Sequence, residues 1–272
     1  MDETFELFLQ AWDDSEKVII LTGAGVSTLS GIPDFRGKNG FYSGGKLWNG
    51  YDKEDLFDID FFHAHPDVFY QFAREYLYPM LDKKPSIVHR TLAALQKTGK
   101  VDFIYTQNID ALHYKAGSVD VGELHGTLQF LKCPKCGERA DIEKFRPRID
   151  SGCMPLCSCG SILKPDVVFF GEALDETLLD KAVSDCEKAD MIWVLGSSLT
   201  VQPAASLPLF TKHNGGKVVI VNADDTPFDH RADFRFYDLE KFCLSAAGCR
   251  SVSSGTNNAA DATAVTGFSP ME

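Results

Sequence analysis

The sequence predicts an α/β fold in which a parallel β-sheet is covered by helices on both faces. Four short runs are rich in β-branched and apolar residues, each run ends in small or polar residues, and helix-like segments lie between the runs. Strands that alternate with helices favour a parallel sheet. Ligands of such sheets bind at the carboxyl ends of the strands, so we expect a site there.

The four predicted strands are continuous apolar runs, which is typical of strands buried on both faces. They are KVIILTGAG at 17–25, VDFIYTQN at 101–108, ADMIWVLGSS at 189–198 and GKVVIVNAD at 216–224. Two predicted helices are PSIVHRTLAALQKTG at 85–99 and DETLLDKAVSDCEKAD at 175–190, and the second has acidic residues in its first turn.

Two segments interrupt the alternation of strands and helices. Residues 38–86 are rich in aromatic residues and predict helices packed over the ligand edge of the sheet. Residues 131–163 contain five of the eight cysteines, with Pro and Gly between them, which is the composition of a small metal-bound module. The end of the chain is rich in Ser, Thr, Asn and Ala, so we expect residues 243–272 to form a disordered tail.

Composition narrows the class of protein. The 272 residues carry a formal net charge of −12 without a basic patch, so we expect no direct binding to nucleic acid. No uncharged apolar run approaches the roughly 18 residues that span a bilayer, and the first twenty residues lack the pattern of an export signal. We therefore expect a cytoplasmic protein with reduced cysteines, not bound to a membrane and monomeric by default.

Two glycine-containing loops are candidates for binding a dinucleotide. Gly23, Ala24 and Gly25 follow the first predicted strand, where glycines let the backbone approach a diphosphate. Thr28 replaces the third glycine of the dinucleotide-binding pattern, so a tight structural turn fits this loop equally well. Gly196, Ser197 and Ser198 end the third predicted strand, and Asn222 and Asp224 end the fourth. The spacing from Gly196 to Asn222 is close to that expected between a phosphate loop and a ribose-binding side chain.

Six blocks of sequence, in order along the chain, point to one family. The first is GAGVSTLSGIPDFRG at 23–37. The others are TQNID at 106–110, LHG at 124–126, PDVVFFGE at 165–172, GSSLTVQPAA at 196–205 and VIVN at 219–222. Together they resemble the sirtuin family over residues 15–242. The resemblance implies a Rossmann-like fold, an NAD-dependent protein-lysine deacetylase and one structural zinc ion.

The resemblance also implies where NAD, the co-substrate, would bind. It assigns residues 1–37, 87–130 and 164–242 to a Rossmann-like NAD-binding domain, 38–86 to the helical part of a smaller domain and 131–163 to its zinc-binding module. The residues implied to bind NAD are Gly23, Ala24, Gly25, Asp34, Phe35, Arg36, Gln107, Asn108, Ile109, Asp110, Gly196, Ser197, Ser198, Asn222 and Asp224. Arg36 would be a cation beside the diphosphate. A strand-end Asn or Asp often caps a helix instead.

His125 in the LHG block is implied to be the general base. An imidazole has an unperturbed pKa near 6.5 and can take up a proton at neutral pH. The acetyl-lysine carbonyl would attack the ribose as nicotinamide leaves, and His125 would then deprotonate a ribose hydroxyl, giving O-acetyl-ADP-ribose and free lysine. Asn108 and Asp110 complete the implied catalytic set, with Asp110 accepting a hydrogen bond from the nicotinamide amide.

The acetyl-lysine protein or peptide is implied to add as a strand between residues 167–172 and 199–202. Its implied contacts are Val168, Phe170, Gly171, Glu172 and Val201. Relatives that prefer succinyl groups place a Tyr and an Arg three residues apart on a helix that reaches the acyl tunnel. The corresponding pair here is Tyr70 and Ala73, so we expect acetyl-lysine to be preferred over succinyl-lysine.

The cysteine cluster departs from the family pattern. Cys133 and Cys136 have the C-x-x-C spacing of a zinc knuckle, but the second pair, Cys157 and Cys159, is one residue shorter than the family implies. Cys153 could replace one member of that pair. The flanking residues favour Cys133, Cys136, Cys157 and Cys159 as the ligands.

Two other functions fit the same nucleotide pocket. An NAD-dependent protein ADP-ribosyltransferase would pass ADP-ribose to a protein acceptor, and a non-catalytic module would bind NAD or acyl-lysine without turnover. Analysis of the reaction products distinguishes the deacetylase, the ADP-ribosyltransferase and the non-catalytic module from one another.

Overall fold

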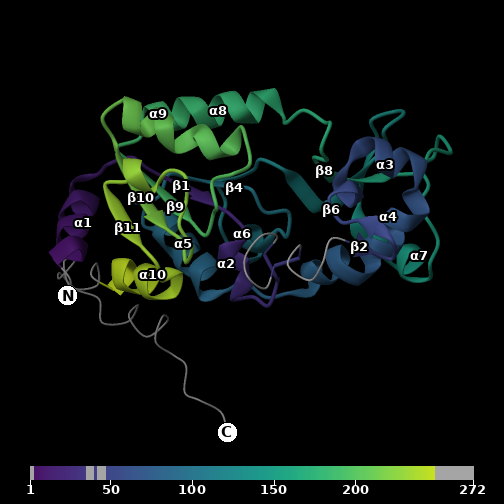
Figure 1. Ribbon diagram of the computed structural model, residues 1–272, viewed down its shortest axis with the longest axis horizontal. Coiled ribbons are helices and arrows are strands. Elements are labelled where there is room, and N and C mark those ends of the chain that lie inside the picture. Colours follow the sequence, from purple (N-terminus) through teal and green to yellow (C-terminus); the bar gives the residue numbers. More distant parts are fainter. Residues whose placement is uncertain (1–2, 35–39, 42–46, 249–272) are drawn as a thin grey trace, which may run out of the picture.

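A parallel sheet forms the centre of the larger lobe in this computed structural model, which describes residues 3–34, 40–41 and 47–248. Within these residues the sheet has six strands in the order β11-β10-β9-β1-β4-β5 (Figure 1). The strands are β1 Val18–Thr22, β4 Phe103–Thr106, β5 Val121–Glu123, β9 Met191–Leu195, β10 Lys217–Val221 and β11 Phe234–Phe236. The predicted α/β class and the four predicted strands are confirmed, and β5 and β11 add a short strand at each edge.

Helices cover both faces of this sheet, as predicted. On one face lie α1 Glu3–Asp14, α5 Ile87–Lys97 and α10 Leu239–Gly248, and on the other lie α8 Glu176–Glu187 and α9 Leu207–His213. The prediction of a disordered tail is wrong for residues 243–248, because Cys243 and Ala246 of α10 are buried against the sheet. No described helix has the length and apolar character needed to cross a membrane.

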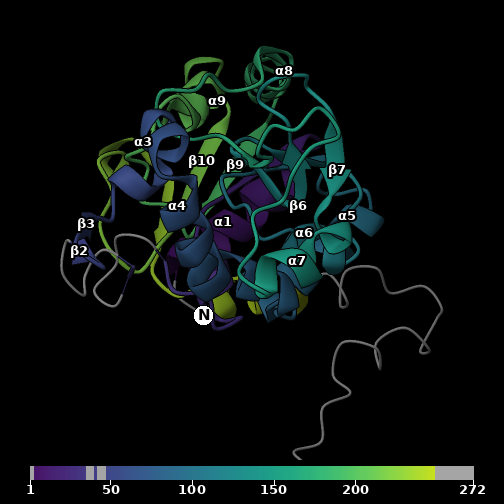
Figure 2. The same ribbon diagram turned by 90° about the vertical axis from the view of Figure 1, so that its right-hand side faces the viewer.

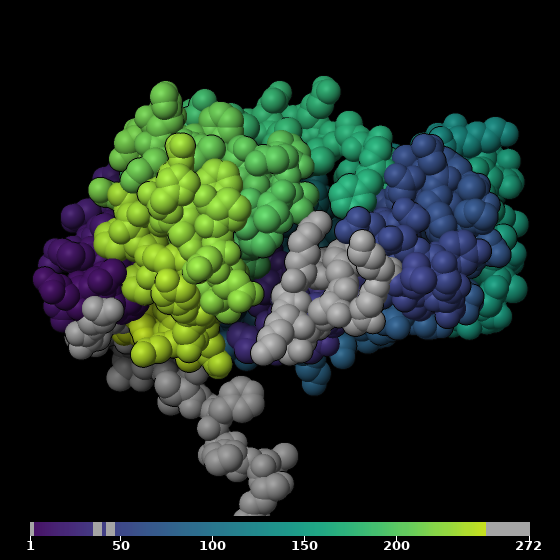
Figure 3. Space-filling model, viewed as in Figure 1, coloured from purple at the N-terminus to yellow at the C-terminus, as the bar shows by residue number. Residues whose placement is uncertain are grey.

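A second hydrophobic core holds the two insertions together in a smaller lobe, which lies beside the larger lobe in Figure 3 and in front of it in Figure 2. Residues 47–82 contribute β2 Leu47–Trp48, β3 Tyr51–Asp52, η1 Asp55–Phe57, α3 Ile59–Ala64, α4 Pro66–Phe72, η2 Ala73–Leu77 and η3 Tyr78–Asp82. Residues 126–167 contribute β6 Gly126–Lys132, β7 Arg139–Asp141, η4 Ile142–Lys144, α7 Arg146–Asp150 and β8 Lys164–Val167. The helices of residues 55–82 were predicted, whereas η4, α7, the β2-β3 pair and the antiparallel sheet β7-β6-β8 were not.

The carboxyl ends of the parallel strands are aligned with one another. Thr22 of β1 pairs with Thr106 of β4 and with Leu195 of β9, and Leu195 pairs with Val221 of β10. The residue that follows each strand therefore lies at the same edge of the sheet. These residues are Gly23, Gln107, Gly196 and Asn222, all of which the sequence singled out.

Candidate active site

A cavity of about 510 Å³ lies between the two lobes at the carboxyl ends of the strands. The predicted site residues that line it are Gly23, Ala24, Gly25, Asp34, Gln107, Asn108, Ile109, His125, Val168, Phe170, Gly171, Glu172, Gly196, Ser197, Ser198, Val201, Asn222 and Asp224. Phe35 and Arg36 lie outside the described residues. Asp110 is placed behind the wall of the cavity rather than on it.

The two glycine loops are in direct backbone contact. The Gly25 amide donates to the Gly196 carbonyl oxygen at 2.8 Å. A Cβ atom on Gly25 would lie 2.7 Å from Cα of Gly196, and one on Gly23 would lie 2.7 Å from the Gly196 oxygen. Both distances are too short for any side chain, so glycine is required here by packing between the loops. Close approach of the two loops, rather than a turn within one of them, therefore explains Gly23 and Gly25, and the same loops form the cavity wall.

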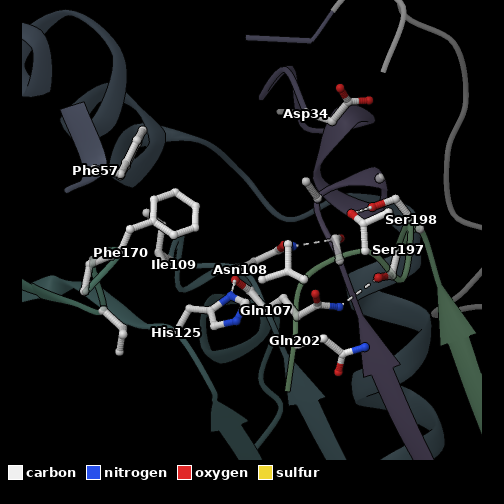
Figure 4. Close-up of a pocket in the computed structure, with 18 of the residues that line it drawn as sticks. Asp34, Phe57, Gln107, Asn108, Ile109, His125, Phe170, Ser197, Ser198 and Gln202 are labelled. Carbon is white, nitrogen blue, oxygen red and sulfur yellow. Dashed lines mark hydrogen bonds between the residues drawn. The ribbon is translucent and has the colours of Figure 1, made fainter. Parts of the chain in front are cut away.

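His125 lines the cavity, and only one of its two ring nitrogens has a hydrogen-bond partner among the described residues (Figure 4). Its Nδ1 lies 2.9 Å from the backbone oxygen of Gln107. A carbonyl oxygen only accepts hydrogen bonds, so Nδ1 carries the proton and Nε2 presents a lone pair. Nε2 has no partner within the described part of the chain. Burial lowers the pKa of His125 and the bond to Gln107 partly opposes this, so the imidazole is neutral at neutral pH.

Asn108 is fixed by a buried chain of side-chain hydrogen bonds. Its Nδ2 donates to the Gly23 carbonyl at 3.0 Å and to Ser27 Oγ at 3.1 Å, and Ser27 Oγ donates to Asp110 Oδ2 at 2.6 Å. These bonds turn the Asn108 oxygen away from Gly23. Asp110 also accepts from the Leu112 amide at 2.9 Å. Burial raises the pKa of Asp110, and the Ser27 hydroxyl opposes that rise. Asp110 thus supports Asn108 from behind.

The segment 167–172 forms the apolar side of the cavity and is tied to His125. The Val168 amide donates to the His125 carbonyl at 2.9 Å. Glu172 accepts from the Phe169 amide and from Lys164 Nζ, each at 2.8 Å, and Lys164 also donates to the Val167 carbonyl at 2.6 Å. The Glu172 carboxylate therefore holds the segment in shape.

Several lining residues were not predicted individually. They are Phe57, Val167, Phe169, Leu174, Thr200, Gln202 and Asp225. Phe57 reaches the cavity because its carbonyl accepts from the Phe170 amide at 2.7 Å, while the Ile59 amide donates to the Phe170 carbonyl at 3.1 Å. Asp58, which caps α3 through the amides of its first turn, marks this position in the sequence. Asp58 pairs with Phe170, and no local sequence pattern predicts a contact between residues so far apart in the chain.

Tyr70 and Ala73 do not line the cavity, contrary to the prediction. Tyr70 is fully buried in the core of the smaller lobe, and its hydroxyl donates to the Leu163 carbonyl at 2.6 Å. Ala73 is buried in the same core. Tyr70 and Ala73 lie on one face of a helical segment, as their spacing predicts, but this face is buried in the core of the smaller lobe, where Tyr70 contacts Leu163.

Four cysteines converge in the smaller lobe. The Sγ atoms of Cys133 and Cys159 are 3.6 Å apart, those of Cys136 and Cys157 are 3.5 Å apart, and all four lie within 4.8 Å of one another. A tetrahedral site with Zn–S bonds of about 2.3 Å separates its sulfurs by about 3.8 Å, so the cluster fits one zinc ion. Cys153 lies apart, in a surface pocket with Arg74 and Arg148. The favoured ligand set is therefore the one that the fold assembles.

Comparison with known proteins identifies the family. The pattern of the Sir2 family matches residues 23–203. This chain belongs to the Sir2 family. It is 46% identical over 230 residues to an NAD-dependent protein deacetylase of Thermotoga maritima, covering 84% of this chain and 91% of that protein. A relative of the same name from Sulfolobus acidocaldarius is 42% identical over 220 residues, which cover 80% of this chain and 84% of that one.

Solved Sir2 structures share the fold. A complex described as Sir2, p53 peptide and NAD+ matches with a TM-score of 0.82 at 42% identity, covering 93% of this chain and all of the other. A complex described as Sir2Tm bound to a propionylated peptide matches with a TM-score of 0.81 at 41% identity, covering 91% of this chain and 99% of that one. The resemblance inferred from the six sequence blocks is confirmed.

Proposed function

We propose that this Sir2 family chain is an NAD-dependent protein-lysine deacetylase that produces nicotinamide, O-acetyl-ADP-ribose and free lysine. The observation that carries the proposal is the position of His125. It lines a cavity between the strand-end loops and the apolar segment 167–172, and its Nε2 has no hydrogen-bond partner among the described residues. The Thermotoga relative is named for this activity, and one solved relative is described as Sir2 bound to acetylated peptide.

His125 acts as the general base, and the residues around it set its state. NAD supplies the electrophilic ribose carbon and the ribose hydroxyls. Nδ1 of His125 is engaged by Gln107, so only Nε2 can take up a proton from a ribose hydroxyl. Asn108, oriented by Gly23 and Ser27, presents its side-chain oxygen as an acceptor for the nicotinamide and ribose end of the site. Phe35, Arg36 and Asp34 complete the loop proposed to close over NAD.

The acetyl-lysine peptide binds as a strand between residues 167–172 and 199–202, with Val168 accepting from the lysine Nε–H. Gly171, Glu172 and Val201 line this part of the cavity, and Phe170 is 51% exposed where the acyl chain would enter. Phe57 and Phe169 extend the apolar wall inward. An apolar wall favours the uncharged acetyl group.

A zinc ion held by Cys133, Cys136, Cys157 and Cys159 would be structural. Four thiolates complete a tetrahedral coordination sphere and leave no open position for substrate. The ion would hold the loops after β6 and before β8 together. It supplies fold stability to the smaller lobe rather than chemistry.

We further propose a monomer that acts in the cytoplasm on protein substrates. The net charge of −12 disfavours nucleic acid and anionic membranes as partners. The cysteines of the described residues are all free of disulfides, as suits a reducing compartment.

One incubation tests the proposed function. The purified protein is incubated with NAD and an acetylated peptide, and the products are separated, identified and quantified by mass spectrometry. A deacetylase yields free-lysine peptide, nicotinamide and O-acetyl-ADP-ribose in equal amounts. A peptide that instead gains ADP-ribose would assign the chain as an ADP-ribosyltransferase, and unchanged NAD would assign it as a binding module.

A further inference from the structure

Two buried histidines outside the cavity lie beneath the catalytic loops. His89 of α5 is 0% exposed and His113 of α6 (Leu112–Lys115) is 2% exposed. Their ring centroids are 4.7 Å apart. Burial lowers the pKa of both imidazoles, and that of His89 falls to about 4, so both rings are neutral at neutral pH.

The tautomer of His113 follows from counting protons. Thr22 Oγ1 donates its single proton to Thr106 Oγ1 at 2.8 Å. Nε2 of His113 lies 2.9 Å from the same Thr22 oxygen, so Nε2 must donate. Nδ1 of His113 is then an acceptor, and it has no partner among the residues that the structure describes.

The tautomer of His89 is set by a capping box at the start of α5. The Ser86 amide donates to Nδ1 of His89 at 3.2 Å, so Nδ1 is the acceptor and Nε2 carries the proton. The Ser86 hydroxyl lies 2.8 Å from the same Nδ1 and gives its single proton to it, so it does not donate to the Val26 carbonyl of α2 (Gly25–Thr28), which is 3.0 Å away. Nε2 of His89 is a buried donor without a partner in the described chain.

The two unpaired groups are complementary, since His89 offers a donor and His113 an acceptor in adjacent rings. A buried donor or acceptor left unpaired costs stability, and the pair can be satisfied together through one shared water or a small ring rotation. Such a link would join the hydrogen bonds of Ser86 and His89 to those of His113, Thr22 and Thr106 in one buried network.

This network ends at the groups that hold the proposed catalytic residues. Thr106 Oγ1 accepts from the Asn108 amide at 3.1 Å, and the Thr22 carbonyl accepts from the Gln107 amide at 2.9 Å. Gln107 in turn holds His125 through its carbonyl oxygen. The Gln107-Asn108 backbone is therefore held in place by the network.

We propose that His113, His89 and the Thr22–Thr106 hydroxyl pair form a positioning network that fixes Asn108 and the anchor of His125 for catalysis. This inference rests on the proposed function. None of the four side chains touches the cavity, so they act through backbone position, where a displacement on the order of 1 Å can lower turnover by about 10².

A spectroscopic measurement tests the network without reference to activity. Two-bond ¹⁵N–¹H correlation spectra of histidine-labelled protein report the tautomer of each ring, with signals assigned from the His89→Gln and His113→Gln proteins. We expect Nε2–H tautomers for both buried histidines, retained from pH 7.5 to about pH 5.5. An Nδ1–H tautomer of His113, or fast exchange between tautomers, would overturn the proposed network.

Activity measurements test its positioning role. Thr106→Val removes the hydroxyl and keeps the shape, and we expect kcat to fall about tenfold or more with the peptide KM changed less than about twofold. Thr106→Ser should restore kcat to within about twofold of the wild type. The matched control is Thr211→Val in α9, which loses an equally buried hydroxyl bond, 2.8 Å to the Cys186 carbonyl, away from the cavity.

Two outcomes contradict the positioning role. One is a Thr106→Val enzyme with wild-type kcat. The other is a Thr211→Val enzyme that loses as much kcat as Thr106→Val at a similar melting temperature, because general destabilisation would then explain both. A wild-type protein without deacetylase activity would contradict the proposed function instead, and the tautomer spectra would still decide whether the network exists.

Discussion

Nδ1 of His125 lies 2.9 Å from the backbone oxygen of Gln107, so the ring is held as the tautomer whose Nε2 carries the lone pair. A residue that only filled space would not need this fixed orientation. This hydrogen bond also links the proposed base to Gln107 and Asn108, the residues that follow β4. The first predictions concern this ring.

Replacing His125 with Ala should lower kcat by roughly 10² or more, the usual contribution of a general base. Melting temperature should change little, because His125 lines the cavity and is not part of a hydrophobic core. His213→Ala, at an exposed position of α9, is the matched control and should retain full activity. Near-normal turnover by His125→Ala would remove His125 from the mechanism.

The acid limb of kcat/KM should lie below pH 6.5. The base must be unprotonated to act, and burial lowers the pKa of His125 from its ordinary value of 6.5. Lowering the pKa extends the active form to more acidic solution. A pH profile of kcat/KM on one acetylated peptide measures this, and a limb at or above pH 6.5 would mean that the site raises the pKa of the base.

His89 should make the folded protein less stable in acid. Its pKa is about 4 when folded and 6.5 when exposed, so the unfolded chain binds more protons between these values. Stability is therefore lost as the pH falls from 6.5 toward 4, by up to about 3 kcal/mol from this residue alone. Urea denaturation at several pH values measures the loss.

The control for this effect is His89→Gln. Glutamine at the same position can preserve the capping box with Ser86 but does not titrate. Its free energy of unfolding should fall less steeply between pH 6.5 and 4 than that of the wild type. Equal slopes in the two proteins would show that His89 is not the titrating group.

One zinc ion should bind per chain, and its loss should disrupt the smaller lobe. Cys159→Ser should abolish stoichiometric zinc in metal analysis and lower the melting temperature. Cys153→Ser is the control at an exposed thiol outside the cluster and should retain both properties. The reverse pattern would transfer the ligand role to Cys153.

Acetyl-lysine should be preferred over succinyl-lysine by about 10² or more in kcat/KM. The described charged residues that line the cavity, apart from His125, are Asp34, Glu172, Asp224 and Asp225, all carboxylates. A succinyl carboxylate would be buried without a cation, and each 1.4 kcal/mol of that cost is about tenfold in rate. Kinetics on one peptide carrying either acyl group measure the ratio, and comparable values would reveal a cation supplied from another segment.

Sequence patterns located the strand-end residues correctly because parallel strands of similar length bring their carboxyl ends to one edge. Gly23, Gln107, Gly196 and Asn222 were predicted for this reason. Short strands carry too few residues for a pattern, so β5 and β11, with three residues each, were not predicted.

The errors arose where a long-range contact decides which way a side chain points. Tyr70 and Ala73 share a helical face, but only the packing of α4 against the second insertion determines that this face is buried. Asp110, whose contact with nicotinamide stays a prediction, is held behind the cavity wall by its bonds to Ser27 and Leu112. Neither contact has a signal in the local sequence.

The contact between Gly25 and Gly196 has a consequence for the order in which the protein becomes functional during synthesis. The two glycines lie far apart in the sequence, and the wall of the proposed NAD site that their loops form exists only when they meet. The smaller lobe is encoded between them and can emerge from the ribosome first. A nascent or truncated chain that ends before β9 therefore has only one of the two loops that form this wall, because the Gly196 loop follows β9. We expect such a chain not to consume cellular NAD.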